Sequence, residues 1–151
     1  MAKVTAKEIK KLRQATGAGI MAVKKALEEA KGDEKKAREI LKKKGLEKLK
    51  KRAGKLAGEG RVFAYVHTGG RVGAMVMIKC ETDFVGRSKE FQVLGKELAM
   101  QVVSMEPKTV KDLLKQAYIR DPKKKVGDLV EEVATRVKEK VVVEKIVRLS
   151  L

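Results

Sequence analysis

The chain has 151 residues, 43% of them hydrophobic and only 3% aromatic, which suits one ordinary domain, or a small domain joined to a helical module. A single Cys and a single His exclude an internal disulfide and a Cys/His metal centre, and no apolar run approaches the ~18 residues that a membrane-spanning helix needs. The formal charge of +17 favours polyanionic partners, namely nucleic acid, the ribosome or an acidic protein, without choosing among them.

Residues 1–45 are expected to form a compact bundle of three helices. Thr5 and Glu8 match a capping box at the start of the first helix, and the glycines at 17 and 19 break it. Asp33 is placed to cap the third helix, which Gly45 is expected to close. The residues expected to face inward are Ile9, Leu12, Ile20, Val23, Leu27, Ala30, Ala37, Ile40 and Leu41.

Residues 46–60 read as a basic linker helix. Its apolar residues follow one helical stripe that reaches Leu56, and three glycines weaken its second half, so we expect a helix that frays into a joint.

Residues 61–151 alternate between strand and helix patterns. Two alternating segments flank Gly69 and Gly70, which supply the positive φ angles of a hairpin turn. The fold class is therefore α+β: a three-helix bundle, a basic connector, and a three-stranded antiparallel sheet packed with helices. The elements expected in this part are strands at 61–67, 71–80 and 141–149 and helices at 88–105, 109–116 and 126–137.

The segment between the second strand and the next helix, 80–85, places an acid beside a large aromatic residue. Burying a Phe side chain is worth roughly 1.5–3 kcal/mol, so an aromatic residue in a loop either packs inward or docks on a partner. In the first case Phe84 fills its own core and Asp83 caps the following turn; the residues alone leave both readings open.

Several segments together resemble the elongation factor Ts family. The first signature is Leu12-Arg13-x-x-Thr16-Gly17-Ala18-Gly19-x-Met21 followed by Lys24-Lys25-Ala26-Leu27, and the second is Cys80-Glu81-Thr82-Asp83-Phe84-Val85. The hairpin Gly69-Gly70-Arg71-Val72-Gly73 and the tail from Ile119 to Leu149 are similar too. The resemblance covers nearly the whole chain in order, with the right gap between the two signatures.

This resemblance implies a guanine nucleotide exchange factor that binds GDP-bound elongation factor Tu and is not itself an enzyme. It implies that the loop residues Thr82, Asp83, Phe84 and Val85 dislodge Mg²⁺ from the partner GTPase, with Asp83 and Phe84 entering it. It also implies that the N-terminal bundle is similar to ubiquitin-associated (UBA-like) domains and docks on the partner's nucleotide-binding domain.

The partner-binding positions that the resemblance assigns to the bundle are Leu12, Arg13, Met21 and Lys24. Leu12 also completes an apolar helix stripe, and Lys24 has the alternative of a solvated charge. Ala22 stands where the family commonly has an acidic residue, which puts that local contact in question.

The chain departs from the family in one further place. Typical members carry a long helical stretch after the Pro107 region, which is missing here, and short members raise the option of a homodimer that completes the binding surface. Cys80 is expected to be a small buried side chain, because a catalytic thiol would need His67 and an acid beside it.

Charge leaves one alternative function. Residues 1–58 hold 19 Lys and Arg against 7 Asp and Glu, which would also suit a basic nucleic-acid- or ribosome-binding protein. The few aromatic residues do not alternate with Lys and Arg in a base-stacking pattern, so no specific nucleic acid is expected. Residues 1–5 show no apolar signal segment, so we expect a cytoplasmic protein without cofactor, metal or membrane attachment.

Overall fold

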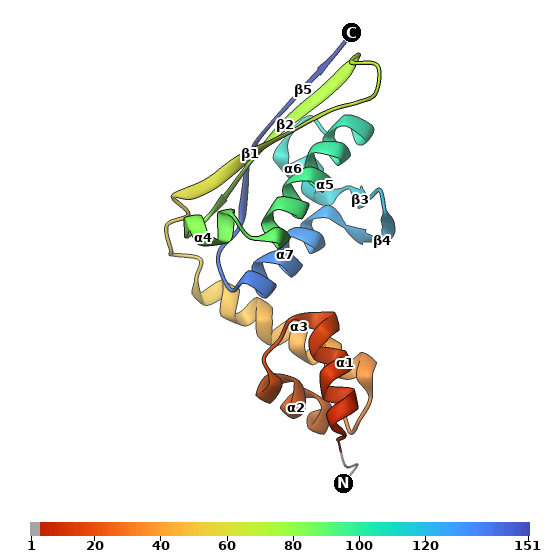
Figure 1. Cartoon of the computed structure of the whole chain (residues 1–151), viewed down its shortest axis with the longest axis vertical. Coiled ribbons are helices and arrows are strands. Elements are labelled where there is room, and N and C mark those ends of the chain that lie inside the picture. The colour runs from red at the N-terminus through yellow and green to blue at the C-terminus, as the bar shows by residue number, and fades with distance from the viewer. Residues whose placement is uncertain (1–3) are drawn as a thin grey trace. The chain divides into compact units, whose positions relative to one another are not determined.

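The computed structural model describes residues 4–151 and divides the chain into two compact units, Met1–Lys51 and Arg52–Leu151 (Figure 1). Residues 1–3, on which part of the expectation about a signal segment rests, lie outside the described residues. Among the described residues, no helix is both long enough and apolar enough to cross a membrane.

The first unit is a bundle of α1 (Ala6–Thr16), α2 (Ile20–Glu29) and α3 (Glu34–Lys51). The capping box of Thr5 and Glu8 is confirmed, because the Thr5 side chain accepts from the Glu8 N–H and the Glu8 carboxylate accepts from the Thr5 N–H. Gly17 ends α1 in the left-handed conformation, with φ 68°. The core of the bundle consists of Leu12, Val23, Ala26, Leu27, Ala30, Ala37 and Leu41.

Three local expectations about residues 1–60 are wrong. α3 does not end at Gly45 but continues to Lys51, because Gly45 is followed by Leu, Glu and Lys residues that favour helix. The linker helix does not reach Leu56, which is 85% exposed beyond the end of α3. Ile20 begins α2 at the surface rather than in the core.

The second unit contains a three-stranded antiparallel sheet of β1 (Glu59–Val66), β2 (Val72–Cys80) and β5 (Val142–Ser150) in the order β1-β2-β5. The predicted hairpin turn is confirmed, with φ 93° at Gly69 and 70° at Gly70. In each strand alternate residues face opposite sides, so one face of the sheet points to the core and the other to solvent.

Helices cover the inner face of this sheet (Figure 1). They are α4 (Asp83–Gly86), α5 (Lys89–Met105), α6 (Val110–Lys115) and α7 (Val126–Val137). A two-stranded ribbon, β3 (Ala117–Tyr118) with β4 (Asp121–Lys125), joins α6 to α7, where no strand was expected. The α+β fold class is confirmed.

α5 lies close against β1 because it carries a glycine at the crossing. A Cβ atom on Gly95 would overlap the ring of Phe63, which packs at a centroid distance of 5.8 Å from Phe91. The buried Gln101 of α5 bonds to the Ala117 carbonyl and the Ile119 N–H, which ties the ribbon to the core. This packing fixes the start of α5, and with it the segment between β2 and α5.

Candidate functional site

The segment between β2 and α5 forms one tight helical turn. β2 ends at Cys80, and Thr82 caps α4 by accepting a hydrogen bond from the Val85 N–H at 3.3 Å. The inward reading of the loop expected Asp83 to cap this turn, but the capping residue is Thr82. Ser88 then caps α5 and also donates to the Val85 carbonyl at 2.7 Å, so the turn is hydrogen-bonded at both ends.

The side chains of this turn point in different directions. Val85 is only 5% exposed and belongs to the core beneath the sheet, whereas Phe84 is 76% exposed. Asp83 lies at the surface, where its carboxylate pairs with Arg87 at 2.9 Å. The reading in which Phe84 fills its own core is therefore wrong, because Val85 occupies that place and turns its neighbour outward.

The strand before the turn is anchored by Glu81. Its carboxylate accepts two hydrogen bonds from the Arg52 guanidinium, at 2.9 and 2.6 Å, and one from the Lys140 N–H at 2.7 Å. The bonds from Arg52 are the largest cause that lowers the pKa of Glu81 to about 2. A carboxylate held this way stays charged at any pH near neutrality.

Cys80 is buried, as expected, and its thiol donates to the Thr82 carbonyl at 3.1 Å. Burial raises the pKa of this thiol. Cys80 pairs with Glu59 at one end of the hairpin, while His67 follows β1 at the other end, so the two do not form a nucleophile and base.

The four predicted residues of the first unit differ in accessibility. Arg13 and Met21 are exposed, Met21 by 62%, and both are available to a partner. Lys24 is exposed too, with a long ion pair to Glu28 at 3.9 Å. Leu12 is fully buried in the core of the bundle, so it supports the surface from within and presents nothing to a partner. Leu12 is therefore a core residue in this structure and not an exposed partner-binding position.

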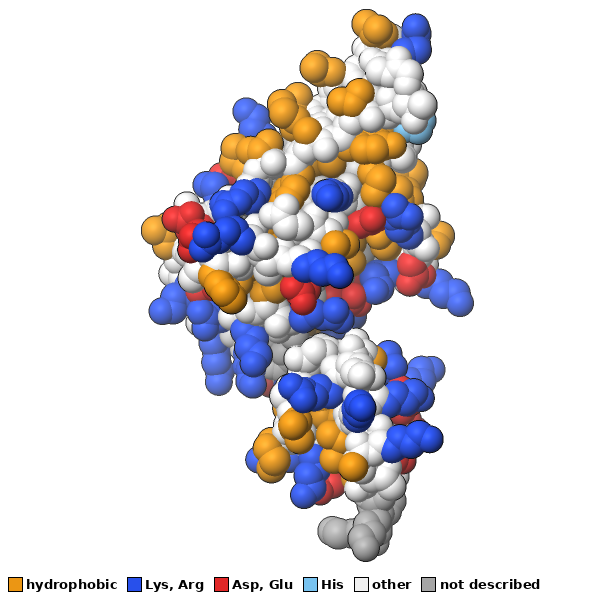
Figure 2. Space-filling model, in the orientation of Figure 1, with side chains coloured by type: hydrophobic (Ala, Val, Ile, Leu, Met, Phe, Trp, Pro, Cys, Tyr) orange, Lys and Arg blue, Asp and Glu red, His pale blue; other side chains and the backbone are white. Residues whose placement is uncertain are grey.

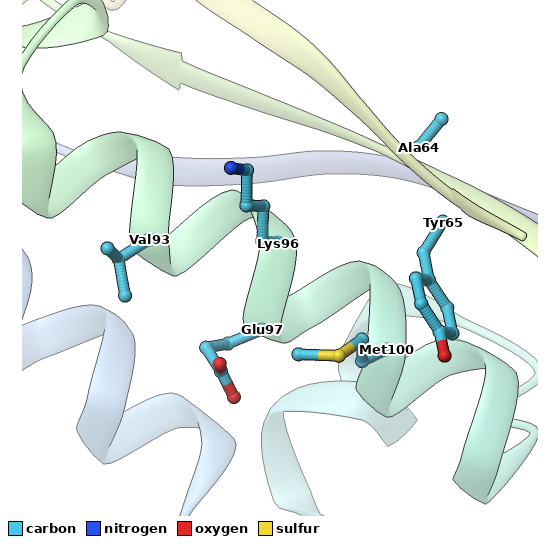
Figure 3. A pocket seen from close by; sticks show the side chains of 6 residues that line it. All are labelled: Ala64, Tyr65, Val93, Lys96, Glu97 and Met100. Atoms are coloured by element: carbon cyan, nitrogen blue, oxygen red, sulfur yellow. The ribbon is translucent and has the colours of Figure 1, made fainter. Parts of the chain in front are cut away.

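A cavity of about 430 Å³ lies elsewhere, between β1 and α5 (Figure 3). Tyr65 points from β1 toward α5, while Ala64 points to the opposite side of the strand. The acid in this cavity, Glu97, already accepts hydrogen bonds from the Tyr118 hydroxyl and the Arg120 guanidinium, both at 2.6 Å. None of the predicted site residues lines this cavity, and the hydrogen bonds of Glu97 to Tyr118 and Arg120 serve to hold the fold.

Sequence reasoning missed two residues that shape the turn. Arg87 lies four positions after Asp83, a helical spacing that could have revealed the ion pair. Glu139 contacts Glu81 and Thr82 from a distant part of the chain, and no periodicity in the sequence signals that contact.

Comparison with known proteins identifies close relatives. The profile of the family described as Elongation factor TS matches residues 2–112 and 81–151. A protein named Elongation factor Ts from Thermoanaerobacter sp. (strain X514) is 37% identical over 190 residues, which cover 96% of this chain and 93% of that protein. The namesake from Anaeromyxobacter dehalogenans (strain 2CP-1 / ATCC BAA-258) is 35% identical over 196 residues, which cover 100% of this chain and 90% of that protein.

A shorter alignment with higher identity is that to the Elongation factor Ts of Thermosipho melanesiensis (strain DSM 12029 / CIP 104789 / BI429), 51% identical over 108 residues, which cover 72% of this chain and 55% of that protein. The alignment of 190 residues with the Thermoanaerobacter protein is longer than this chain of 151 residues. That relative therefore contains residues without a counterpart here.

Proposed function

Because this chain belongs to the elongation factor Ts family of translation factors, we propose that it is a guanine nucleotide exchange factor that binds GDP-bound elongation factor Tu and accelerates GDP release. The observation that carries this proposal is Phe84, a large aromatic side chain held outward on a hydrogen-bonded turn of the second family signature. The chain itself catalyses no covalent step in this proposal.

The chemistry of exchange follows from what holds GDP in a GTPase. Mg²⁺ and the backbone N–H groups of the phosphate-binding loop together bind the diphosphate. In our proposal Asp83 and Phe84 enter the partner near the metal, displace it and disturb that loop, while Thr82 and Val85 shape the turn. Each ~1.4 kcal/mol by which the factor selectively weakens GDP binding gives about tenfold faster release.

The free protein already holds the turn in a form suited to docking. The Phe84 side chain would become buried on binding, and such burial is worth roughly 1.5–3 kcal/mol. Because the backbone of the turn is fixed by hydrogen bonds at both ends, little ordering entropy is lost on association.

The first unit provides the second proposed contact. We assign to it the exposed residues Arg13, Met21 and Lys24, on a UBA-like bundle that binds the partner's nucleotide-binding domain. Met21 is the strongest candidate, because a flexible exposed thioether adapts to a partner surface. Figure 2 shows hydrophobic side chains at the surface of this unit.

We also propose that two copies of the chain pair through the outer face of the sheet. Figure 2 shows hydrophobic side chains at the surface along the strands, and cross-strand neighbours such as Met75 and Val147 lie side by side. The charged side chains on this face include Lys145 and, toward one end, Lys79, which pairs with Glu144 at 3.5 Å; a second copy offers the apolar part of the face the same apolar chemistry. The apolar residues of this outer face are Val62, Ala64, Val66, Met75, Met77, Val147 and Leu149.

Light scattering after gel filtration tests this pairing. The parent chain of 16.7 kDa is expected to elute at twice that mass, and Met75→Lys at the monomer mass, because a buried unpaired ammonium is costly. Val93→Lys, which places the same charge on an exposed valine of α5, is the control that stays dimeric. A parent chain that is monomeric at every concentration would contradict the pairing.

The release of fluorescent GDP from elongation factor Tu tests the exchange function. A small amount of this chain is expected to accelerate the release from a large excess of elongation factor Tu at both low and moderate salt. If it gave no acceleration while remaining folded, the exchange function would be wrong. Binding to RNA that falls steeply with salt would then favour the nucleic-acid-binding alternative.

A further inference from the structure

The turn that carries Phe84 is too short to be stable by itself. α4 has four residues, and helix nucleation is unfavourable for so short a segment, so other parts of the chain must hold it. One residue that holds the turn is Glu139, which lies 57 positions after Thr82 in the sequence. Its carboxylate accepts hydrogen bonds from the Glu81 N–H at 3.1 Å, the Thr82 N–H at 3.0 Å and the Thr82 hydroxyl at 2.7 Å.

Local structure aims Glu139 at the turn. Lys138 ends α7 in the left-handed conformation, with φ 60°, which directs the chain away from the helix axis at the next residue. The contact is reciprocal, because the Lys140 N–H returns a hydrogen bond to the Glu81 carboxylate at 2.7 Å. Lys140 also donates through Nζ to the Ala53 carbonyl at 2.8 Å. Residues 139–140 and 81–82 are thus bonded in both directions.

The bond to the Thr82 hydroxyl links this clamp to the helix cap. The hydroxyl donates its hydrogen to Glu139, which leaves the oxygen free to accept from the Val85 N–H. The same oxygen therefore joins Glu139 to the cap of α4. A charged acceptor makes stronger hydrogen bonds than a neutral one, so the carboxylate matters beyond its shape.

We propose that Glu139 is a positioning residue that holds the Thr82–Val85 turn in the conformation that projects Phe84 toward the partner. The role in exchange rests on the proposed function, whereas the effect on the turn does not. Gln at this position keeps the size of the side chain and one acceptor oxygen, which can still serve the Glu81 and Thr82 N–H groups. It removes the charge and places an NH₂ group, which cannot accept a hydrogen bond, where Oε1 accepts from the Thr82 hydroxyl.

The first test needs no partner protein. The chain contains no Trp, so Phe84→Trp introduces a single Trp reporter in the turn, which can be excited apart from the two Tyr residues. In that background Glu139→Gln is expected to lower the fluorescence anisotropy of the indole and to speed hydrogen exchange at the Glu81 and Thr82 amides. Glu131→Gln, which removes an exposed charge from α7, is the matched control and should change neither quantity.

The second test measures GDP release from elongation factor Tu. Glu139→Gln is expected to lower kcat/KM for exchange about tenfold, the effect of losing hydrogen bonds to a charged group. Thr82→Val should give a similar loss, Thr82→Ser should retain activity because it keeps the hydroxyl, and Glu139→Gln with Thr82→Val should lose little more than either alone. A merely structural role would lower the melting temperature without this pattern.

The outcomes separate the two ideas. Unchanged anisotropy and hydrogen exchange in Glu139→Gln would overturn the positioning role. So would a loosened turn with full exchange activity. If Glu139→Gln failed to fold, Thr82→Val would carry both measurements. If the parent chain itself did not accelerate GDP release, the proposed function would fail, and the anisotropy result alone would decide whether Glu139 holds the turn.

Discussion

Phe84 and Val85 are neighbours in the sequence with opposite surroundings. Val85 packs into the core and Phe84 points to solvent. We predict that Val85→Ala lowers the free energy of unfolding by about 1–3 kcal/mol, because it leaves a cavity, whereas Phe84→Ala changes it by less than about 0.5 kcal/mol. Denaturant unfolding of both variants checks this. A larger loss for Phe84→Ala than for Val85→Ala would place the aromatic ring in the core after all.

At Gly95 the absence of a side chain is itself required. Gly95→Ala would force its methyl group against the Phe63 ring, and overpacking of this kind costs about 1–3 kcal/mol. Gly54→Ala is the control, since a Cβ there meets no atom within 4 Å. Thermal unfolding should show a lower melting temperature for Gly95→Ala only. Equal melting temperatures would mean that α5 shifts away from β1 at no cost.

At the scale of elements, Glu81 joins the end of β2 to the segment around Arg52 and to Lys140 after α7. The hydrogen bonds from Arg52 and Lys140 and the charges of Arg52 and Lys55 lower the pKa of Glu81, and burial partly opposes them. The pKa of Glu81 falls from 4.5 to about 2 in the folded chain, so the unfolded chain binds the proton more readily. The stabilisation is therefore complete above pH 4.5 and is lost as the pH falls toward 2.

We predict that the stability of the parent chain decreases over this pH range and that Glu81→Gln removes part of the decrease. The comparison requires denaturant unfolding of both chains at several pH values between 2 and 7, the lower bound being the pKa of Glu81 and the upper one neutrality. An identical slope in Glu81→Gln would show that other carboxylates cause the acid sensitivity.

Local signals in the sequence were sufficient for most elements and failed where long-range contacts decide. Thr5 with Glu8, and Gly69 with Gly70, predict a helix start and a hairpin turn by chemistry confined to a few residues. The continuation of α3 past Gly45 depends on the balance of propensities over a longer stretch. In the short ribbon, β3 has only two residues, and β4 is polar and basic and lacks the alternation typical of a strand.

The candidate site shows the same limit. The family signature drew attention to residues 82–85, but the outward direction of Phe84 depends on how Val85 packs in the core. The contact between Glu139 and Thr82 joins residues 57 positions apart, and such a contact leaves no periodic trace in a single sequence.

At the scale of the molecule, fold, charge and signature serve different ends. The charge of +17 favours encounter with acidic surfaces, but steering of this kind changes association rates more than it selects a partner. Specificity in our account comes from the exposed turn of the second unit, and the other helices and strands of that unit hold the turn in place.

The most direct measurement is the rate of GDP release from elongation factor Tu with the parent chain, Phe84→Ala and Leu56→Ala. Leu56 is also an exposed hydrophobic residue but lies outside the turn, so its variant controls for a general loss of apolar surface. We predict that Phe84→Ala loses at least about tenfold in kcat/KM, the effect of ~1.4 kcal/mol, while Leu56→Ala retains the parent value. Full activity in Phe84→Ala would contradict the claim that this turn drives exchange.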